Sequence, residues 1–408
     1  MYIYKAAVLG AGAMGAEIAQ TISFAGLPVV IKDVNQELVD RGIEKARAIY
    51  QRRVDRGKMS AADVEPKIAL IGGTTTYDGV EDVDIVIEAV PEQIALKNQV
   101  FKELDEATPE TCILASNTSA LSISEIAGAT GRPHKVVGMH FFYPAHVMKL
   151  VEVVPGVDTA EETVDDTASF AESLRKIPVR VQECAGFLVN RLLLPYLNEA
   201  AMALQEGAAS AAEIDAAMRD WGFPMGPFTL CDVLGLDVGA SVGRTLYEAY
   251  GPRMAPAALW QKIIAAGRHG QKSGGGFYDY GGESEGGDVG EAVAAMIAEV
   301  QEETGISGTE FSIERLMYPM INEAVTCLQE HVSSAGDMDI AMLAGLGFPQ
   351  DKGGILRYAD SIGLDRVLEG LERHTTELGD RFWPAPMLKR MVAAGHLGQK
   401  AGRGFFTY

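Results

Sequence analysis

The sequence predicts an α/β domain followed by two related all-α domains, and three observations lead to that fold class. From residue 1 to about 183, short apolar runs alternate with longer amphipathic stretches, which is the rhythm of a doubly wound parallel sheet. Beyond that point the apolar residues follow a helical period. The helical region then repeats itself. We therefore expect domains at 1–183, 184–281 and 292–408, with the glycine-rich, acidic segment 281–291 as a linker.

The composition is that of an acidic globular protein. The 408 residues carry a formal net charge of -21, which argues against nucleic acid or an anionic membrane surface as the main partner. The four cysteines are widely scattered, so they predict neither a disulfide framework nor a metal site. We expect no signal peptide and no membrane span, and the cysteine usage favours a reducing, cytoplasmic compartment.

Short apolar runs mark the expected strands of the first domain. Helix-like spacers separate them, as a parallel sheet requires. The runs lie at residues 4–10, 28–33, 67–72, 84–90, 111–116 and 135–142.

The turn after the first strand predicts a dinucleotide site. In GAGAMG, Gly10 permits a tight turn, Gly12 lets the backbone approach a pyrophosphate and Gly15 lets helix and strand pack closely; Met14 lies in the same turn. The next strand ends in Asp33, at the distance where a carboxylate binds a ribose 2′-hydroxyl. Because Asp33 would repel a 2′-phosphate, the predicted Rossmann domain favours NAD over NADP.

A histidine and a carboxylate further along the domain are candidates for acid–base chemistry. His140 and Glu152 lie in two strand-like runs joined by a short connection, so the fold can bring the imidazole and the carboxylate together. A buried Glu152 needs a partner and would hold an imidazole in one tautomer. Ser119 follows another strand, at the end where α/β sheets bind ligands, whereas Ser122 is explained as a helix N-cap. His146, in the connection, is expected at the surface.

The helical region contains an internal repeat. NRLLLPYLNEA at 190–200 matches ERLMYPMINEA at 314–324, and GQKSGGGFYDY at 270–280 returns as GQKAGRGFFTY at 398–408. The offsets, 124 and 128 residues, indicate a helical domain that was duplicated with small insertions.

One position differs between the copies in a way that matters for chemistry. Asn190 of the first copy is replaced by Glu314 in the second, inside a preserved frame of arginine, proline and Asn-Glu. This difference predicts one active copy and one scaffold copy.

A basic segment stands out in the acidic chain. Residues 41–58 hold seven Lys or Arg against two acids. The segment is either a solvated helix face or a clamp for the phosphates of coenzyme A, with Arg53 and Lys58 as the candidate ligands.

Taken together, these motifs resemble a known family. GAGAMG, Asp33, EAVPEQIALK, SNTS, HFFYP, MKLVEV, GFLVNRLL and the repeated closing phrase are similar to those of NAD-dependent L-3-hydroxyacyl-CoA dehydrogenases. The duplicated helical domain resembles the dehydrogenase half of the multifunctional β-oxidation enzymes. The resemblance covers essentially the whole chain and implies reversible NAD-dependent oxidation of an (S)-3-hydroxyacyl-CoA, with substrate in the cleft between the first two domains.

The resemblance also implies roles for individual residues. His140 would be the general base for the 3-hydroxyl proton and Glu152 would orient it, while Ser119 and Asn190 would hydrogen-bond the substrate oxygens.

On the NAD side the resemblance implies Glu92, Lys97 and Lys272, the last in the first copy of the repeated phrase. Lys400, its counterpart, would meet no nicotinamide. Tyr143 departs from the family, which usually has asparagine there, near the cofactor and the acyl group.

Two other functions stay open at the level of sequence. A β-hydroxyacid dehydrogenase of another type shares the glycine motif, but such enzymes use a helix lysine that GFLVNRLLLPYLNEA lacks. A non-catalytic NAD-binding structural protein would keep the fold without the chemistry. For partners we expect an acyl-CoA thioester, no nucleic acid and no membrane, and a separate enoyl-CoA hydratase or thiolase as a candidate. The chain is expected to be a monomer or a homodimer.

Overall fold

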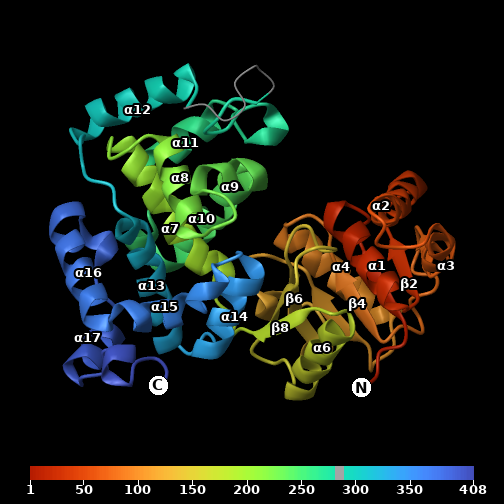
Figure 1. Cartoon of the computed structure of the whole chain (residues 1–408). Helices are drawn as coiled ribbons and strands as arrows, with labels where there is room; N and C mark the ends of the chain where they lie inside the picture. Colours follow the sequence, from red (N-terminus) through yellow and green to blue (C-terminus); the bar gives the residue numbers. More distant parts are fainter. Residues whose placement is uncertain (281–288) are drawn as a thin grey trace. The chain divides into compact units, whose positions relative to one another are not determined.

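A computed structural model describes residues 1–280 and 289–408, and most of the linker predicted at 281–291 lies outside the described residues. The chain divides into two compact units, Met1–Phe187 and Leu188–Tyr408. Figure 1 shows the first as strands with helices and the second as helices. The predicted fold class, an α/β domain followed by a helical region, is confirmed.

The first unit is built on one eight-stranded sheet with the order β3-β2-β1-β4-β5-β6-β7-β8. Neighbouring strands are parallel except for β6 and β7, which are antiparallel. The strands are β1 Ala6–Leu9, β2 Val29–Lys32, β3 Ile71–Thr74, β4 Ile85–Glu88, β5 Ile113–Ser116, β6 Val136–Phe141, β7 Leu150–Pro155 and β8 Ile177–Arg180.

Six α-helices complete the first unit. They are α1 Ala13–Ala25, α2 Gln36–Asp55, α3 Val64–Ile68, α4 Ile94–Ala107, α5 Ile123–Ala127 and α6 Glu161–Ser173. One predicted strand is partly wrong: the apolar run 67–72 begins as the last turn of α3, and β3 starts only at Ile71. The run contains Lys67 and Ile68 at the end of a short helix whose apolar residues face the core, and periodicity alone does not separate such a turn from a strand.

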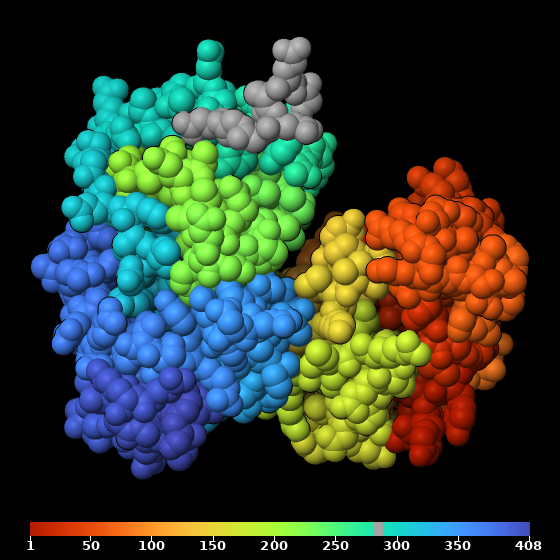
Figure 2. All heavy atoms as spheres, viewed as in Figure 1, coloured from red at the N-terminus to blue at the C-terminus, as the bar shows by residue number. Residues whose placement is uncertain are grey.

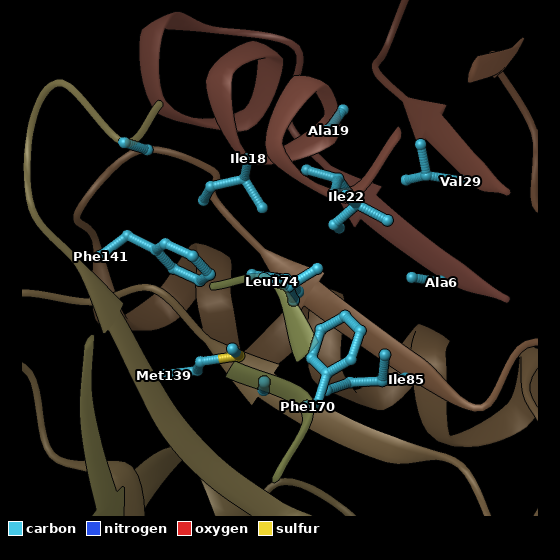
Figure 3. Close-up of a cluster of buried hydrophobic side chains, with 14 of the residues drawn as sticks. Ala6, Ile18, Ala19, Ile22, Val29, Ile85, Met139, Phe141, Phe170 and Leu174 are labelled. Carbon is cyan, nitrogen blue, oxygen red and sulfur yellow. The ribbon is translucent and has the colours of Figure 1, made fainter. Parts of the chain in front are cut away.

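The main core lies between one face of the sheet and helices α1, α2 and α6. Figure 3 shows Ile18 and Ile22 of α1 directed toward Met139 and Phe141 of β6, with Phe170 of α6 in the same cluster. On the other face, α5 packs against β6 and β7, and α4 packs against α5. Both faces are therefore covered, which explains why strands β1, β4, β5, β6 and β7 are buried along their whole length.

The second unit contains two copies of a five-helix arrangement. The first consists of α7 Val189–Gln205, α8 Ala211–Trp221, α9 Pro227–Leu234, α10 Leu236–Tyr250 and α11 Ala258–Ala265. The second consists of α13 Ile313–Gln329, α14 Ala335–Gly345, α15 Ile355–Ile362, α16 Leu364–Leu378 and α17 Pro386–Ala393. Between them, α12 Glu291–Thr304 packs against α11 and α7 of the first copy, although the sequence had grouped it with the second.

The two copies contact each other through α7 and α13, and Figure 2 shows the first copy, green, directly against the second, blue. The contact is reciprocal. Arg191 donates from Nε to Glu323 over 2.7 Å, and Arg315 donates from Nε to Glu199 over the same distance. A self-complementary contact of this kind is the geometry of a twofold dimer, here formed within one chain.

The repeated closing phrase has a structural task in both copies. Asp232 accepts hydrogen bonds from the backbone N–H groups of Phe277 and Tyr278 at 2.8 and 2.9 Å. Asp360 does the same for the second phrase. A Cβ on Gly276 would lie only 1.9 Å from Oδ1 of Asp232, so glycine is required for the carboxylate to reach the backbone.

Candidate functional site

The glycine turn joins β1 to α1. It lies where the strand order changes direction, because β1 has β2 on one side and β4 on the other. Gly10 has a φ of +95°, which glycine adopts without strain. A Cβ on Gly15 would lie 1.7 Å from the carbonyl oxygen of Gly10, whereas a Cβ on Gly12 would meet no atom within 4 Å. Gly10 and Gly15 are thus needed by the fold itself. Gly12 faces open space at the start of α1, and Met14, the second residue of the helix, is partly buried and packs against the core.

Asp33 lies directly after β2 and is held against this turn. Its Oδ2 accepts a hydrogen bond from the N–H of Ala11 at 2.7 Å, and its Oδ1 accepts one from Val34 at 2.7 Å. Neighbouring Lys32 is engaged elsewhere, with Nζ 4.4 Å from the centre of the Tyr77 ring. The open space at Gly12, the helix N-terminus and the carboxylate together fit a dinucleotide.

Glu92 and Lys97 belong to a polar network at the end of β4, in which Lys97 is buried and Glu92 is exposed. The Nζ of Lys97 lies 2.7 Å from Glu88 and 3.3 Å from Glu92, and the lysine side chain is 1% exposed. Glu88 also accepts a hydrogen bond from the hydroxyl of Ser116 at 2.6 Å. Sequence reasoning missed Glu88 and Ser116. A carboxylate in the last position of an apolar strand was the available signal for Glu88.

The loop that contains Ser119 is tied to the same network. Glu92 accepts hydrogen bonds from the hydroxyl of Thr118 at 2.6 Å and from the N–H of Ser119 at 2.8 Å. Asn117, which the sequence did not single out, accepts one from the N–H of Phe141 at 2.8 Å. This loop is therefore joined to the end of β6. Ser122 begins α5 as predicted, with its side chain accepting from Glu125 N–H.

His140 and Glu152 are brought together by the antiparallel pairing of β6 and β7, in which they are direct partners. The His140 Nδ1 lies 2.7 Å from Oε2 of Glu152. The side chains are 6% and 0% exposed. The rings of Phe142 and Phe187 lie 4.5 and 5.8 Å from the imidazole, centre to centre, and shield it from water. The structure thus brings His140, Glu152 and the Ser119 loop to one region of the first unit.

The expectation that His146 lies at the surface is wrong. Its side chain is 21% exposed and its Nδ1 lies 3.2 Å from Oε2 of Glu17, a carboxylate that is itself buried. Glu17 also lies 3.3 Å from Lys45 and accepts a hydrogen bond from the N–H of Ala145 at 2.6 Å. A buried glutamate of α1 therefore anchors the connection between β6 and β7, which includes the exposed Tyr143. The spacing of residues in the sequence did not predict that His146 and Glu17 are partners.

The basic segment 41–58 consists of all but the first five residues of α2 and the turn that follows. Arg53 is half-buried, with its guanidinium carbon 4.3 Å from the centre of the Phe24 ring. Lys58 is exposed. Their role as phosphate ligands stays a prediction.

In the second unit, Asn190 lies in the first turn of α7, and Glu314 occupies the matching turn of α13. Lys272 pairs with Asp237 at 2.6 Å, and Lys400 pairs with Asp365 at the same distance. This ion pair belongs to the shared framework of both copies, so it does not distinguish a cofactor ligand from a scaffold residue. Within residues 1–280 and 289–408, no acidic, histidine or cysteine cluster suited to a metal ion is found. No helix in those ranges is long and apolar enough to cross a bilayer.

Two family models match the chain. The model described as 3-hydroxyacyl-CoA dehydrogenase, NAD binding domain, matches residues 5–184. The model described as 3-hydroxyacyl-CoA dehydrogenase, C-terminal domain, matches residues 186–280 and again 311–408. NAD is therefore the cofactor of the first unit, as the glycine turn and Asp33 predicted.

The curated relatives are longer proteins. A fatty acid oxidation complex subunit alpha from Shewanella amazonensis is 41% identical over 396 residues, which are 96% of this chain and 56% of the relative. The subunit of the same name from Shewanella oneidensis is 41% identical over 394 residues, 96% of this chain and 55% of the relative. The chain thus spans about half the length of the curated relatives it matches.

Solved structures match the fold. A 3-hydroxybutyryl-CoA dehydrogenase from Escherichia coli superposes with a TM-score of 0.87 at 30% identity, covering 97% of this chain and 99% of that one. An (S)-3-hydroxybutyryl-CoA dehydrogenase from Ralstonia eutropha gives a TM-score of 0.67 at 39% identity, covering 69% of this chain and 100% of that one. The difference in coverage shows that the E. coli protein extends over much more of the chain described here.

Proposed function

The chain belongs to the 3-hydroxyacyl-CoA dehydrogenase family, and on that premise we propose that it catalyses the reversible oxidation of (S)-3-hydroxyacyl-CoA thioesters to 3-oxoacyl-CoA thioesters. Family members are NAD-dependent oxidoreductases, so the chain is an enzyme of that class. The substrate, the stereochemistry and the residue roles below are the content of the proposal. It is favoured over a β-hydroxyacid dehydrogenase because both units match models of this family.

The observation that carries the proposal is the contact between His140 and Glu152. With Nδ1 of the neutral ring donating to the carboxylate over 2.7 Å, Nε2 carries the lone pair and can accept a proton from the 3-hydroxyl of the substrate. Glu152 keeps the ring in that tautomer and stabilises the imidazolium that forms. Because both side chains are almost fully buried, water competes little for the transferred proton.

Two polar side chains are proposed to bind the substrate oxygens. Ser119 offers a hydroxyl from a loop that Glu92 and Asn117 hold in place through three hydrogen bonds. Asn190 offers an amide from the first turn of α7. Donors are needed because negative charge develops on the 3-oxygen when its proton leaves before or with the hydride.

The residues proposed to hold NAD are Gly10, Gly12, Met14, Gly15, Asp33, Glu92, Lys97 and Lys272. When bound, NAD accepts the hydride from C3 of the substrate. Asp33 can accept hydrogen bonds from a ribose and disfavours a 2′-phosphate, while Gly12 leaves room for the pyrophosphate. Lys97 pairs with both Glu88 and Glu92 and so orders the two carboxylates at the end of β4.

Arg53 and Lys58 are proposed to bind phosphates of coenzyme A, and Tyr143 to contact the acyl group or the nicotinamide. Lys58 is exposed and Tyr143 is 57% exposed, so a ligand can reach both side chains. Charge reversal at Arg53 should raise the KM for a CoA thioester far more than for a truncated thioester. Equal effects on both substrates would contradict the clamp.

A separate enoyl-CoA hydratase or thiolase is the proposed protein partner. The named relatives are subunits of a fatty acid oxidation complex, and the strongly acidic chain offers a charged surface for such an assembly. The second helical copy occupies the place that a dimer partner would take against α7, so we propose that the chain is a monomer or at most a homodimer.

The deciding experiment follows NADH absorbance with acetoacetyl-CoA and compares the wild type with His140→Ala, Glu152→Gln and His134→Ala. His134 is exposed in the same unit and serves as the matched control. We expect activity with NADH, much less with NADPH, and a loss of about two orders of magnitude or more in kcat in the first two variants. Activity that survives His140→Ala would exclude this residue as the base, and absence of turnover with bound NADH would favour the structural alternative. Faster oxidation of the (R) than of the (S) alcohol would refute the stereochemistry.

A further inference from the structure

The first helical copy contains a cavity that the reaction chemistry leaves without a role. Its volume is about 610 Å³, within the roughly 300–1,000 Å³ typical of small-molecule sites. It lies among α7, α10, α11 and the segment 251–256, entirely within the second unit. Its wall includes Leu194, Gly239, Gly243, Met254, Trp260 and Ile264.

Two polar side chains of this wall, Asn198 and Arg253, are already engaged, whereas the buried Nε1 of Trp260 has no hydrogen-bond partner among the described residues. The amide of Asn198 donates to the carbonyl of Ala255 over 2.9 Å and accepts from the N–H of Ala257 over 2.8 Å. Arg253 pairs with Glu323. What remains for a ligand is mostly apolar surface, so the cavity suits a hydrocarbon group rather than a polar one.

The second copy fills the corresponding space. Asn322 makes the same two hydrogen bonds as Asn198, to Trp383 and Ala385, which fixes the structural equivalence of the two regions. At the positions of Leu194, Gly239, Gly243 and Met254 the second copy carries Tyr318, Val367, Leu371 and Phe382.

These larger side chains pack tightly. Leu371 and Phe382 are 0% exposed, and a Cβ on Gly370 would lie 2.1 Å from the Tyr318 ring. The cavity is therefore found in the first copy, which carries Asn190. In the second copy, which carries Glu314, larger side chains fill the equivalent space. A general packing defect of the fold would not divide the copies in this way.

The cavity also adjoins the proposed substrate contact along one helix. Asn190, Leu194 and Asn198 are spaced four residues apart on α7, so they lie on one face. Leu194 is one turn, roughly 6 Å of helix rise, beyond Asn190. A substrate whose 3-oxygen meets Asn190 would therefore have the cavity within reach of the carbons beyond C3.

We propose that this cavity binds the aliphatic end of the acyl group, so that the enzyme acts on 3-hydroxyacyl-CoA thioesters longer than four carbons. The proposal rests on the function proposed above and adds the substrate class. Burial of each added methylene is worth about 0.8 kcal/mol, which corresponds to about a fourfold gain in kcat/KM per methylene until the cavity is full.

The first test introduces into the first copy a larger side chain that the second copy carries at the equivalent position. Gly243→Leu introduces the counterpart of Leu371, and a Cβ at this position meets only Leu194, at 3.9 Å, so the helix should accept it. The matched control, Ala249→Leu, introduces the same side chain on the exposed part of α10 outside the cavity. We expect the ratio of kcat/KM for 3-oxodecanoyl-CoA to that for acetoacetyl-CoA to fall at least about 20-fold in Gly243→Leu and to stay unchanged in Ala249→Leu. A ratio that is equal in wild type and Gly243→Leu would overturn the proposal.

The second test locates the acyl chain without turnover. A decanoyl-CoA brominated at its terminal carbon should quench the fluorescence of Trp260, one of three tryptophans in the chain. The quenching should disappear in Trp260→Phe and weaken in Gly243→Leu. Quenching that persists in Trp260→Phe, or its absence in the wild type, would refute the assignment. If no thioester is turned over but the quenching is found, the proposed reaction fails while the acyl site stands.

Discussion

Arg191 and Glu323 join the two helical copies through a hydrogen bond of 2.7 Å in which both side chains are almost completely buried. Glu323 also accepts from Arg253, so one carboxylate serves two arginines. The exchange is mirrored by Arg315 and Glu199. Arg191 directly follows Asn190 in the sequence. The second copy lacks the asparagine, but its Glu323 holds Arg191 in place beside Asn190.

Removal of Glu323 should therefore destabilise the second unit. In Glu323→Ala the buried guanidinium of Arg191 loses this partner, and we expect a loss of about 3–5 kcal/mol in the free energy of unfolding, measured with urea. The control is Glu161→Gln, which breaks an exposed pair with Arg180 and should cost much less stability because solvent screens this pair. Equal losses in the two variants would contradict the importance of burial.

Two glycines of the dinucleotide turn should respond to alanine in opposite ways. Gly15→Ala forces a Cβ against the carbonyl of Gly10, so we expect a strongly destabilised or insoluble protein. Gly12→Ala places its methyl in open space, so the melting temperature should stay close to that of the wild type. NADH affinity, measured by fluorescence titration, should nevertheless fall about tenfold or more because the methyl occupies the pyrophosphate position. A Gly12→Ala variant with wild-type affinity would show that NAD does not approach this residue.

The repeated phrase allows a lysine to be compared with its own counterpart. Lys272→Met and Lys400→Met each remove an exposed ion pair with an aspartate, at little cost in stability. If Lys272 contacts NAD, its replacement should raise the KM for NADH about tenfold, and that of Lys400 should leave it unchanged. Identical kinetics of the two variants would assign both lysines to the scaffold.

A buried histidine of the second copy should make the protein sensitive to acid. Burial is the main cause that lowers the pKa of His374 from its ordinary value of 6.5 to about 4. The charges of Arg373, Arg315 and Arg381 contribute to this shift, and the charge of Glu314 opposes it. Between these pH values the unfolded chain binds a proton that the folded chain does not, so stability falls as the pH drops from 6.5 toward 4.

In His374→Leu, which installs the residue found at Leu246 of the first copy, this fall should be shallower by up to roughly 1.4 kcal/mol per pH unit. Urea titrations at several pH values, with His134→Asn as the exposed control, would measure it. Parallel stability curves for wild type and His374→Leu would contradict the pKa shift.

Local patterns in the sequence determined a large part of this protein. The glycine turn, the carboxylate after β2, the βαβ rhythm and the two matching helical blocks predicted the fold class, the cofactor and the family, because each depends on residues that are close along the chain. The pairing of His140 with Glu152 could also be anticipated, since only a short connection separates their strands.

The tertiary structure decided what depends on distant residues. Glu88 and Ser116 around Lys97, the anchoring of the β6–β7 connection by Glu17, and the reciprocal arginines of the two copies join positions between 9 and 132 residues apart. The cavity beside α7 arises from glycines whose significance appears only when four segments surround them. Sequence periodicity reports which face of an element is apolar, but packing determines which partner that face meets and where space is left open.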